Sequence, residues 1–177
     1  MTQLVSLSHR LALDEAIEAI EAATIEPANR AARAAQAVSN FCRQRDGLDG
    51  LKYSFNSQEY VRKLIYADPA DRFSILALIW QPRQQTPIHA HQCWCAVSIY
   101  SGELIEISYD LDEQLGKGSV QERWRRARSR GDVTYDAAST GECHRIVNQT
   151  DAIAVSVHVY GVAASRVNEA VNRVVAP

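Results

Sequence analysis

The stretch from His89 to Gly102 reads HAHQCWCAVSIYSG and decides how the rest of the sequence is interpreted. Two histidines and two cysteines stand at every second position, and a hydrophobic run and a glycine follow. Side chains alternate between the two faces of a strand, so His89 and His91 point the same way. Two imidazoles on one buried face need polar partners, and a single divalent metal ion would satisfy both. The stretch therefore predicts a strand that carries part of a metal site.

Length and composition are those of an ordinary globular protein. The chain has 177 residues, of which 46% are hydrophobic and 23% charged, and its formal net charge is −2. This length predicts a single domain over residues 1–177, large enough to bury a core. The small net charge gives no electrostatic argument for a nucleic-acid or membrane partner. No apolar run approaches the ~20 residues that a membrane helix needs.

The N-terminal sequence and the cysteines predict where the protein works. The first residues, MTQLVSLSHRLALDEA, lack the basic start and long apolar stretch of a secretion signal, so we expect a cytoplasmic protein. In that compartment cysteines are more often thiols, ligands or reactive groups than disulfides. The sequence has four of them, Cys42, Cys93, Cys95 and Cys143.

Residues 1–50 have a helical pattern, and residues 51–177 have a β pattern. Apolar residues recur at helical spacing along Leu13–Ala23 and again along Ala32–Cys42, and Pro27 suits the first turn of the second helix. The β part contains short segments rich in β-branched and aromatic residues, with turn residues between them. The clearest are FSILALIW (73–80), CAVSIYSGELIEISYD (95–110), GDVTYD (131–136) and AIAVSVHVYG (152–161). Such a series predicts a closed antiparallel barrel or a sandwich.

Two segments need separate interpretation. The last one, ASRVNEAVNRVV (164–175), fits either a helix or a strand. The basic strip RWRRARSR (123–130) could hold phosphates and stack a base on its tryptophan. Because the strip is single and the whole chain is slightly acidic, we interpret it as a solvent-facing strand.

A third metal ligand has to come from another segment. His144 follows a turn and opens a new strand, and His158 lies within the buried-looking strand AVSVHVY. Neutral imidazoles suit zinc, copper, iron and nickel. A rival interpretation is a closed structural zinc site that adds the thiolates of Cys93 and Cys95 to the two histidines. Alternate residues of a straight strand are ~6.6 Å apart, which argues against four ligands from one strand.

The spacing of these residues resembles that of the cupin family of small β-barrels. The first cupin motif has a histidine pair, a glutamate and a glycine, which correspond here to His89 and His91, Cys95 and Gly102. The second has a glycine, a histidine and an asparagine. Their counterparts here are Gly141, His144 and Asn148, with Gly131 as a plausible opening glycine.

A cysteine at the glutamate position makes the chain resemble the thiol dioxygenases, and most closely the cysteine dioxygenase family. SVHVY (156–160) looks like that family's Ser-x-His-x-Tyr signature, YVRKL (60–64) looks like its substrate-arginine segment, and Trp80 lies at the expected distance before the histidine pair. The resemblance implies a mainly β, cupin-type barrel preceded by N-terminal α-helices. It also implies a ferrous iron, Fe(II), bound by His89, His91 and His144. The implied activity is oxidation of L-cysteine by O2 to cysteine sulfinic acid.

The resemblance assigns roles to further residues. Tyr160 is expected to supply an acid or orienting hydroxyl, with His158 and Ser156 as a relay behind it. Cys95 is expected to form a thioether bond to the Tyr160 ring. Arg62 is the expected clamp for the substrate carboxylate, because a guanidinium can hold it bidentately, and Tyr60 could add a hydroxyl.

Some features resemble a second branch, the bacterial 3-mercaptopropionate dioxygenases. These are the short gap between His91 and Cys95, Trp94, and the glycine after Tyr160. That branch binds the carboxylate from an arginine beyond the signature tyrosine, where Arg166 lies. Because Arg62 is present, L-cysteine is the expected substrate and 3-mercaptopropionate the alternative. The non-enzymatic alternative is a metal-holding or ligand-sensing cupin in which Cys95 is a core residue. Cys93 and Cys143 are interpreted as inert buried thiols.

Overall fold

The computed structural model describes residues 7–44, 48, 56, 58–111, 119–138 and 142–176, with side chains from residue 11 to residue 175. Gly141, the expected glycine of the second cupin motif, lies outside the described residues. Among these residues two α-helices come first and ten strands follow, with a third, short helix before the last strand. In chain order the elements are α1 Leu7–Ile25, η1 Pro27–Asn29, α2 Arg30–Arg43, β1 Val61–Ala67, β2 Ser74–Trp80, β3 Ile88–His91, β4 Cys95–Ser101, β5 Leu104–Leu111, β6 Val120–Arg128, β7 Val133–Asp136, β8 Cys143–Val147, β9 Ala154–Tyr160, η3 Ala164–Arg166, α3 Val167–Ala170 and β10 Asn172–Ala176.

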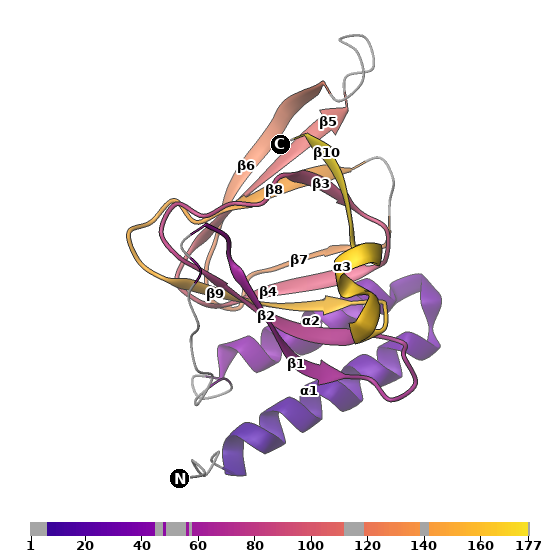
Figure 1. Cartoon of the computed structure of the whole chain (residues 1–177). Helices are drawn as coiled ribbons and strands as arrows, with labels where there is room; N and C mark the ends of the chain where they lie inside the picture. Colours follow the sequence, from indigo (N-terminus) through magenta and orange to yellow (C-terminus); the bar gives the residue numbers. More distant parts are fainter. Residues whose placement is uncertain are drawn as a thin grey trace.

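The strands form two five-stranded antiparallel sheets that face each other. The first sheet has the order β1-β2-β9-β4-β7 and the second has the order β10-β3-β8-β5-β6. Figure 1 shows three layers, with the β10-to-β6 sheet on one side, the β1-to-β7 sheet in the middle and helices α1 and α2 beneath it. The prediction of a mainly β, cupin-type barrel behind N-terminal helices is confirmed.

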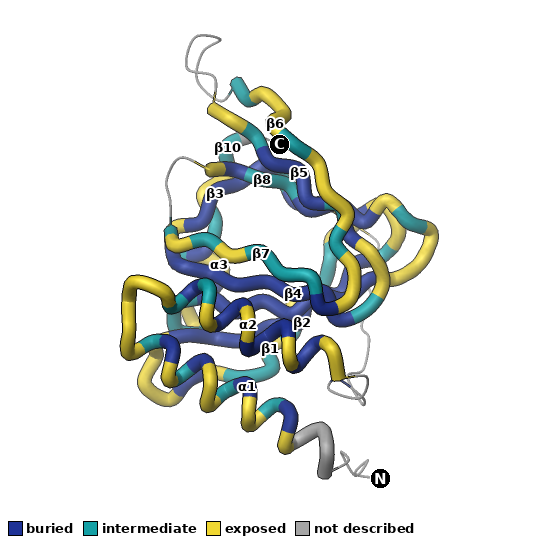
Figure 2. The backbone as a smooth tube through the Cα atoms, turned by 180° about the vertical axis from the view of Figure 1, so that it is seen from behind, coloured by how far each residue is buried: buried dark blue, intermediate teal, exposed yellow. Residues whose placement is uncertain are grey.

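Helix α2 covers the outer face of the middle sheet, which explains why its central strands β2, β9 and β4 are buried on both faces. Its apolar stripe, with Val38 and Phe41 fully buried, packs in one cluster with Ile75, Ala77 and Val157. The opposite side chains of the same strands, such as Leu76 and Leu78, belong to a second cluster inside the barrel. A strand buried on both faces is a continuous apolar run. Figure 2 shows β2 and β4 as buried along their length.

Gly102 has a backbone requirement that matches its place in the first motif. It lies in the turn between β4 and β5 with a φ of +75°, a conformation that disfavours L side chains. A Cβ at this position would lie 2.9 Å from the Cα atom of Ala154. The motif glycine is therefore explained by a left-handed turn pressed against the start of β9.

The structure resolves the two ambiguous segments. The C-terminal segment contains both possibilities, because η3 and α3 form a short helical turn and β10 then pairs with β3. The basic strip lies in β6, an edge strand that pairs with β5 alone. Most of its arginines are exposed, as expected, although Trp124 and Arg128 are half-buried. In the described part of the chain, no helix is both long and apolar enough to cross a membrane.

Candidate metal centre and active site

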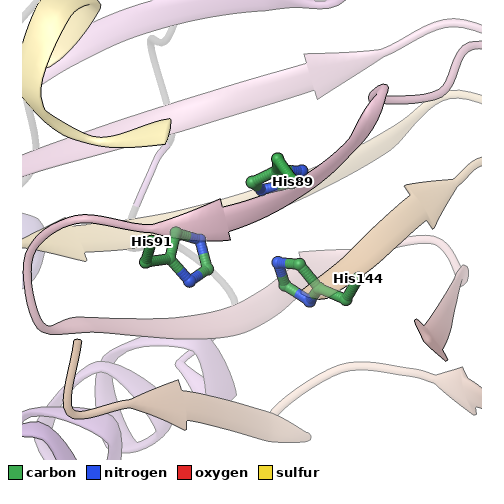
Figure 3. Close-up of side chains that lie close together, drawn as sticks. All are labelled: His89, His91 and His144. Atoms are coloured by element: carbon green, nitrogen blue, oxygen red, sulfur yellow. The ribbon is translucent and has the colours of Figure 1, made fainter. Parts of the chain in front are cut away.

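Three of the predicted site residues come together between two neighbouring strands. His89 and His91 lie on β3, and His144 lies on β8 directly opposite His89. The ring centroids are 5.1 Å apart for His89 and His91, 4.7 Å for His89 and His144, and 4.9 Å for His91 and His144. One nitrogen of each ring lies within 4.8 Å of the others. Figure 3 shows the three rings gathered around a common space. This cluster could hold one metal ion.

The Nδ1 atom of each ring has a polar partner, which leaves Nε2 as the ring nitrogen available to a metal ion. His89 Nδ1 lies 3.0 Å from the Pro87 carbonyl oxygen, His91 Nδ1 lies 3.3 Å from an Asp136 carboxylate oxygen, and His144 Nδ1 lies 3.0 Å from a Glu106 carboxylate oxygen. An acceptor at Nδ1 places the ring proton there and leaves Nε2 with a lone pair. Within the described residues, the buried Nε2 of His144 has no hydrogen-bond partner. Three imidazole nitrogens gathered in this way, one of them buried without a partner, fit a metal ion.

The electrostatic environment keeps the imidazoles of His89 and His91 neutral. Burial, followed by the neighbouring His144 and His91, lowers the pKa of His89 to about 3. Burial also lowers the pKa of His91, although Asp136 opposes that shift. Imidazole binds a metal as the neutral ring, so a low pKa keeps the ligand available at neutral pH.

The cysteines do not belong to the cluster, which contains three histidines and neither Cys93 nor Cys95. The Sγ atom of Cys95 lies 3.3 Å from His91 Nδ1, the ring atom that Asp136 also contacts. Burial raises the pKa of Cys95 well above its usual value and that of Cys93 to about 11, so both are thiols at neutral pH. This arrangement does not support the closed site of two histidines and two thiolates.

A buried chain of hydrogen bonds runs along the inner face of β9. The Trp80 indole Nε1 donates to Ser156 Oγ over 2.9 Å, Ser156 Oγ lies 2.8 Å from His158 Nε2, and His158 Nδ1 lies 2.9 Å from the Tyr160 hydroxyl oxygen. Because the indole can only donate, Ser156 Oγ accepts the hydrogen bond from Trp80. The Ser156 hydroxyl can then donate its own hydrogen bond to His158 Nε2. His158 then donates from Nδ1 to Tyr160, which leaves the Tyr160 O–H free to donate elsewhere. The structure thus brings the expected relay residues into contact, with Trp80 at its far end.

Tyr160 and Cys95 face each other across two paired strands. They are directly opposite in the β4–β9 register and belong to the same interior cluster. Directly opposite residues have Cβ atoms about 4.5–5.5 Å apart. Burial, followed by the neighbouring Cys95, raises the pKa of Tyr160 well above its usual value, so the phenol keeps its proton at neutral pH.

Arg62 lies at the edge of the barrel, and its guanidinium is fixed from two sides. Nη2 donates to the Tyr60 hydroxyl over 2.9 Å, and Nη1 donates to the Asn168 amide oxygen over 3.3 Å. The Tyr60 ring stacks on Trp80 with centroids 4.4 Å apart. Tyr60 lies directly before β1, and its hydroxyl orients Arg62 by accepting this hydrogen bond. The positive charge of Arg62 opposes the rise in the Tyr160 pKa, so Arg62 interacts electrostatically with this buried phenol.

Arg166, the alternative carboxylate-binding residue, lies in a different cavity. That cavity also contains Arg30, Arg72, Cys93 and Trp94 in its wall, whereas Arg62 lines a cavity with Pro87 and Asn168. Pro87, whose carbonyl oxygen holds His89, lines the cavity of Arg62, and the positive charge of Arg62 contributes to the lowered pKa of His89. These two observations favour Arg62 over Arg166 as the carboxylate-binding group.

Comparison with known families decides the classification. The family model described as cysteine dioxygenase type I matches residues 26–172, a range that includes α2 and strands β1 to β9 and stops at the first residue of β10. The chain belongs to the cysteine dioxygenase family. This family consists of metal-dependent cupin thiol dioxygenases, so the three-histidine cluster lies in an enzyme of the dioxygenase type.

The chain is also similar to solved cupin structures. One is a cupin domain of an XRE family transcriptional regulator from Enterobacter cloacae, with 17% identity, 58% of this chain and 96% of that chain covered, and a TM-score of 0.43. Another is a double-stranded β-helix protein from Klebsiella pneumoniae, with 19% identity, 66% and 83% covered, and a TM-score of 0.45. A third is a cupin domain from Bordetella pertussis, with 16% identity, 60% and 97% covered, and a TM-score of 0.43.

The sequence analysis did not single out two acidic residues that contact the cluster. Glu106 on β5 and Asp136 on β7 hold the Nδ1 atoms of His144 and His91. The signal for Glu106 is its parity, because Leu104 and Glu106 share a strand face and Leu104 is buried. A charged residue on a buried face is a functional candidate. By contrast, the motif residue Asn148 bonds the main chain of the β8–β9 turn and of Trp80, so its contacts are structural.

Proposed function

We propose that this member of the cysteine dioxygenase family is an iron-dependent enzyme that oxidises L-cysteine to cysteine sulfinic acid. In this reaction the thiolate sulfur gains both atoms of one dioxygen molecule and no other reductant is consumed. The observation that carries the proposal is the cluster of three imidazoles, among which the buried Nε2 of His144 has no hydrogen-bond partner within the described residues. In the proposal Fe(II) is held by His89, His91 and His144, and it supplies open positions for the substrate thiolate and for O2.

The substrate carboxylate is assigned to Arg62. A guanidinium that already has Tyr60 and Asn168 as partners presents a fixed fork to a carboxylate, and its positive charge contributes to the pKa shifts of His89 and Tyr160. L-Cysteine and 3-mercaptopropionate both carry a thiol and a carboxylate, and the amine distinguishes them. A cytoplasmic location agrees with this proposal, because free thiols are kept reduced there.

Tyr160 is assigned the acid or orienting hydroxyl, with His158 and Ser156 holding it. Its raised pKa keeps the O–H as a donor, and the His158 contact fixes the direction of that donor. Replacing Tyr160 with phenylalanine removes the donor and leaves the ring. We expect kcat to fall about 10²-fold, within the range for a positioned proton donor, with little change in metal content. Steady-state oxygen uptake and metal analysis measure the two quantities.

The matched control for this variant is Tyr135→Phe, because Tyr135 is 55% exposed and lies on β7. The control is expected to keep the parent kcat. If Tyr160→Phe also kept the parent kcat, the hydroxyl would have no part in turnover.

A thioether between Cys95 and Tyr160 is also part of the proposal. Their direct opposition in the β4–β9 register supports it. Formation of the bond removes one hydrogen from the thiol and one from the ring, with dioxygen as the oxidant. After turnover, intact mass spectrometry is expected to show a species lighter by two hydrogens, and Cys95→Ser is expected to lack it. A parent protein that keeps its full mass after turnover would contradict the crosslink.

Oxygen uptake by the iron-loaded protein tests the substrate. L-Cysteine and 3-mercaptopropionate are compared as substrates, and the products are identified by mass. A larger kcat/KM for L-cysteine, with cysteine sulfinic acid as product, is the expected result. A larger kcat/KM for 3-mercaptopropionate would show that the alternative substrate is the preferred one. Failure to oxidise either thiol, in protein shown to hold iron, would favour the non-enzymatic cupin.

A further inference from the structure

Glu106 is a buried carboxylate that the proposed reaction does not use. It lies on β5, is 2% exposed, and faces the barrel interior. Its Oε1 atom lies 3.0 Å from His144 Nδ1 and accepts a hydrogen bond from the Thr134 hydroxyl, also over 3.0 Å. Its Oε2 atom accepts from Arg128 Nε over 2.9 Å and from Nη2 over 2.7 Å. Both oxygen atoms of a buried acid are therefore fully engaged.

The strand register explains why this acid reaches the cluster. On β5, Ser108 is the residue opposite His144, and Glu106 is two residues away on the same face. Diagonal neighbours on one face of a sheet are within reach of long side chains. Arg128 lies on β6, opposite Leu104 and thus diagonal to Glu106 on the other side. Thr134 lies on β7 in the facing sheet, so Glu106 joins the two sheets beside the candidate metal centre.

The three histidines differ in what holds them. His89 donates to a neutral main-chain carbonyl, and His91 lies 3.3 Å from its carboxylate and equally far from the Cys95 thiol. His144 alone among the three has a carboxylate at 3.0 Å. A carboxylate at Nδ1 fixes the tautomer, orients the ring and makes Nε2 a stronger donor. On its far side Glu106 forms an ion pair with Arg128, whose Nη2 lies 2.7 Å from Oε2.

We infer that Glu106 is the positioning residue for the metal ligand His144, and that Arg128 is its counterion. The inference rests on the proposed function, because His144 must be a ligand for Glu106 to orient it. Glu106 touches neither substrate nor metal. It acts through the ring, by holding the proton on Nδ1 and the lone pair of Nε2 toward the ion.

Substitution by glutamine should invert this arrangement. Arg128 offers only donors, so the amide of a glutamine at position 106 would turn its oxygen toward Arg128 and its NH2 group toward His144. Nδ1 would then have to accept, and the ring proton would move to Nε2, where the metal needs a lone pair. Glu106→Gln is therefore expected to weaken metal binding by about 10- to 100-fold, the usual cost of losing such a partner.

A variant without the counterion Arg128 shows whether Glu106 positions His144 or only contributes to packing. Arg128→Met leaves the Glu106–His144 contact in place and removes only the charge behind it. A positioning role predicts metal affinity within about threefold of the parent, or tighter, because the carboxylate charge is less neutralised. A structural role alone predicts that both variants lose metal affinity alike, because each breaks the same buried pair.

The experiment is an anaerobic titration of each protein with Fe²⁺ against a competing chelator, and in parallel with Co²⁺ by visible absorption. Glu103→Gln is the matched control, because Glu103 is exposed and precedes the same strand. Thermal unfolding of the metal-free proteins shows that each variant is folded. Weaker binding in Glu106→Gln with parent-like binding in Arg128→Met and Glu103→Gln is the expected result.

Two outcomes would overturn the inference: parent-like affinity in Glu106→Gln, or equal losses in Glu106→Gln and Arg128→Met. Neither outcome depends on thiol oxidation, because no thiol or oxygen is present in the titration. A parent protein that binds one metal ion but oxidises no thiol would instead refute the proposed function and leave this inference standing.

Discussion

Replacing His144 with alanine is expected to abolish metal binding while the barrel remains folded. His144 supplies the one candidate ligand from β8, and its Nε2 is buried without a partner among the described residues. Two histidines from a single short strand then remain, with no third donor in the cluster. The loss of affinity should exceed the roughly 100-fold that loss of an outer partner costs. Metal content after loading with Fe²⁺, together with thiol-dependent oxygen uptake, measures the effect.

The control for this variant is His9→Ala, which removes a histidine of helix α1. Metal content and oxygen uptake are expected to equal those of the parent in the control. A His144→Ala protein that still bound one Fe²⁺ per chain would show that the ion sits elsewhere.

Replacing Arg62 with alanine is expected to weaken substrate binding far more than it slows turnover. Hydrogen bonds to a charged group contribute about 1.5–3 kcal/mol, which corresponds to a rise in KM of roughly 10- to 100-fold. The side chain is exposed, so solvent reduces its contribution toward the lower end of that range. The effect should be confined to thiols that carry a carboxylate. KM for L-cysteine and for 2-aminoethanethiol, which lacks one, separates the two cases.

Arg166→Ala is the matched control, because Arg166 lines the cavity with Cys93 and Trp94 and not the one beside Pro87. Its KM for L-cysteine is expected to stay at the parent value. A large rise in KM for Arg166→Ala, with none for Arg62→Ala, would show that Arg166 binds the substrate carboxylate.

Local pattern was sufficient to predict a series of antiparallel strands and the histidine pair on one of them, whereas the cupin barrel and the full set of three histidine ligands were implied by the family resemblance. Strand parity placed His89 and His91 on one face, and the cluster confirms that they lie together with His144. The pairing of Cys95 with Tyr160 depended on the family resemblance, because residues 65 positions apart acquire a shared register only in the folded sheet. The role of Arg62 depended on it too, since an exposed arginine at the start of a strand has no distinguishing signal.

The acidic partners could not be predicted from pattern alone. Glu106 shares its strand face with the apolar Leu104 but also with Asp110, so the strand pattern leaves its burial open until the sheet order places β5 between β6 and β8. Asp136 ends β7, and only the β4–β7 register places it opposite Cys95. The sequence also could not predict that α2 covers the middle sheet, because an amphipathic helix can pack on the outer face of either sheet. Each of these features is decided by contacts between segments far apart in the sequence.

The most direct test of the central claim uses isotopically heavy dioxygen. Protein loaded with Fe²⁺ is mixed with L-cysteine and heavy O2, and the product is analysed by mass spectrometry together with the amount of oxygen consumed. The account predicts cysteine sulfinic acid with both sulfinate oxygen atoms labelled and one O2 consumed per thiol, and no product from His144→Ala. Cystine as the only product, or sulfinate carrying one unlabelled oxygen atom from water, would contradict it.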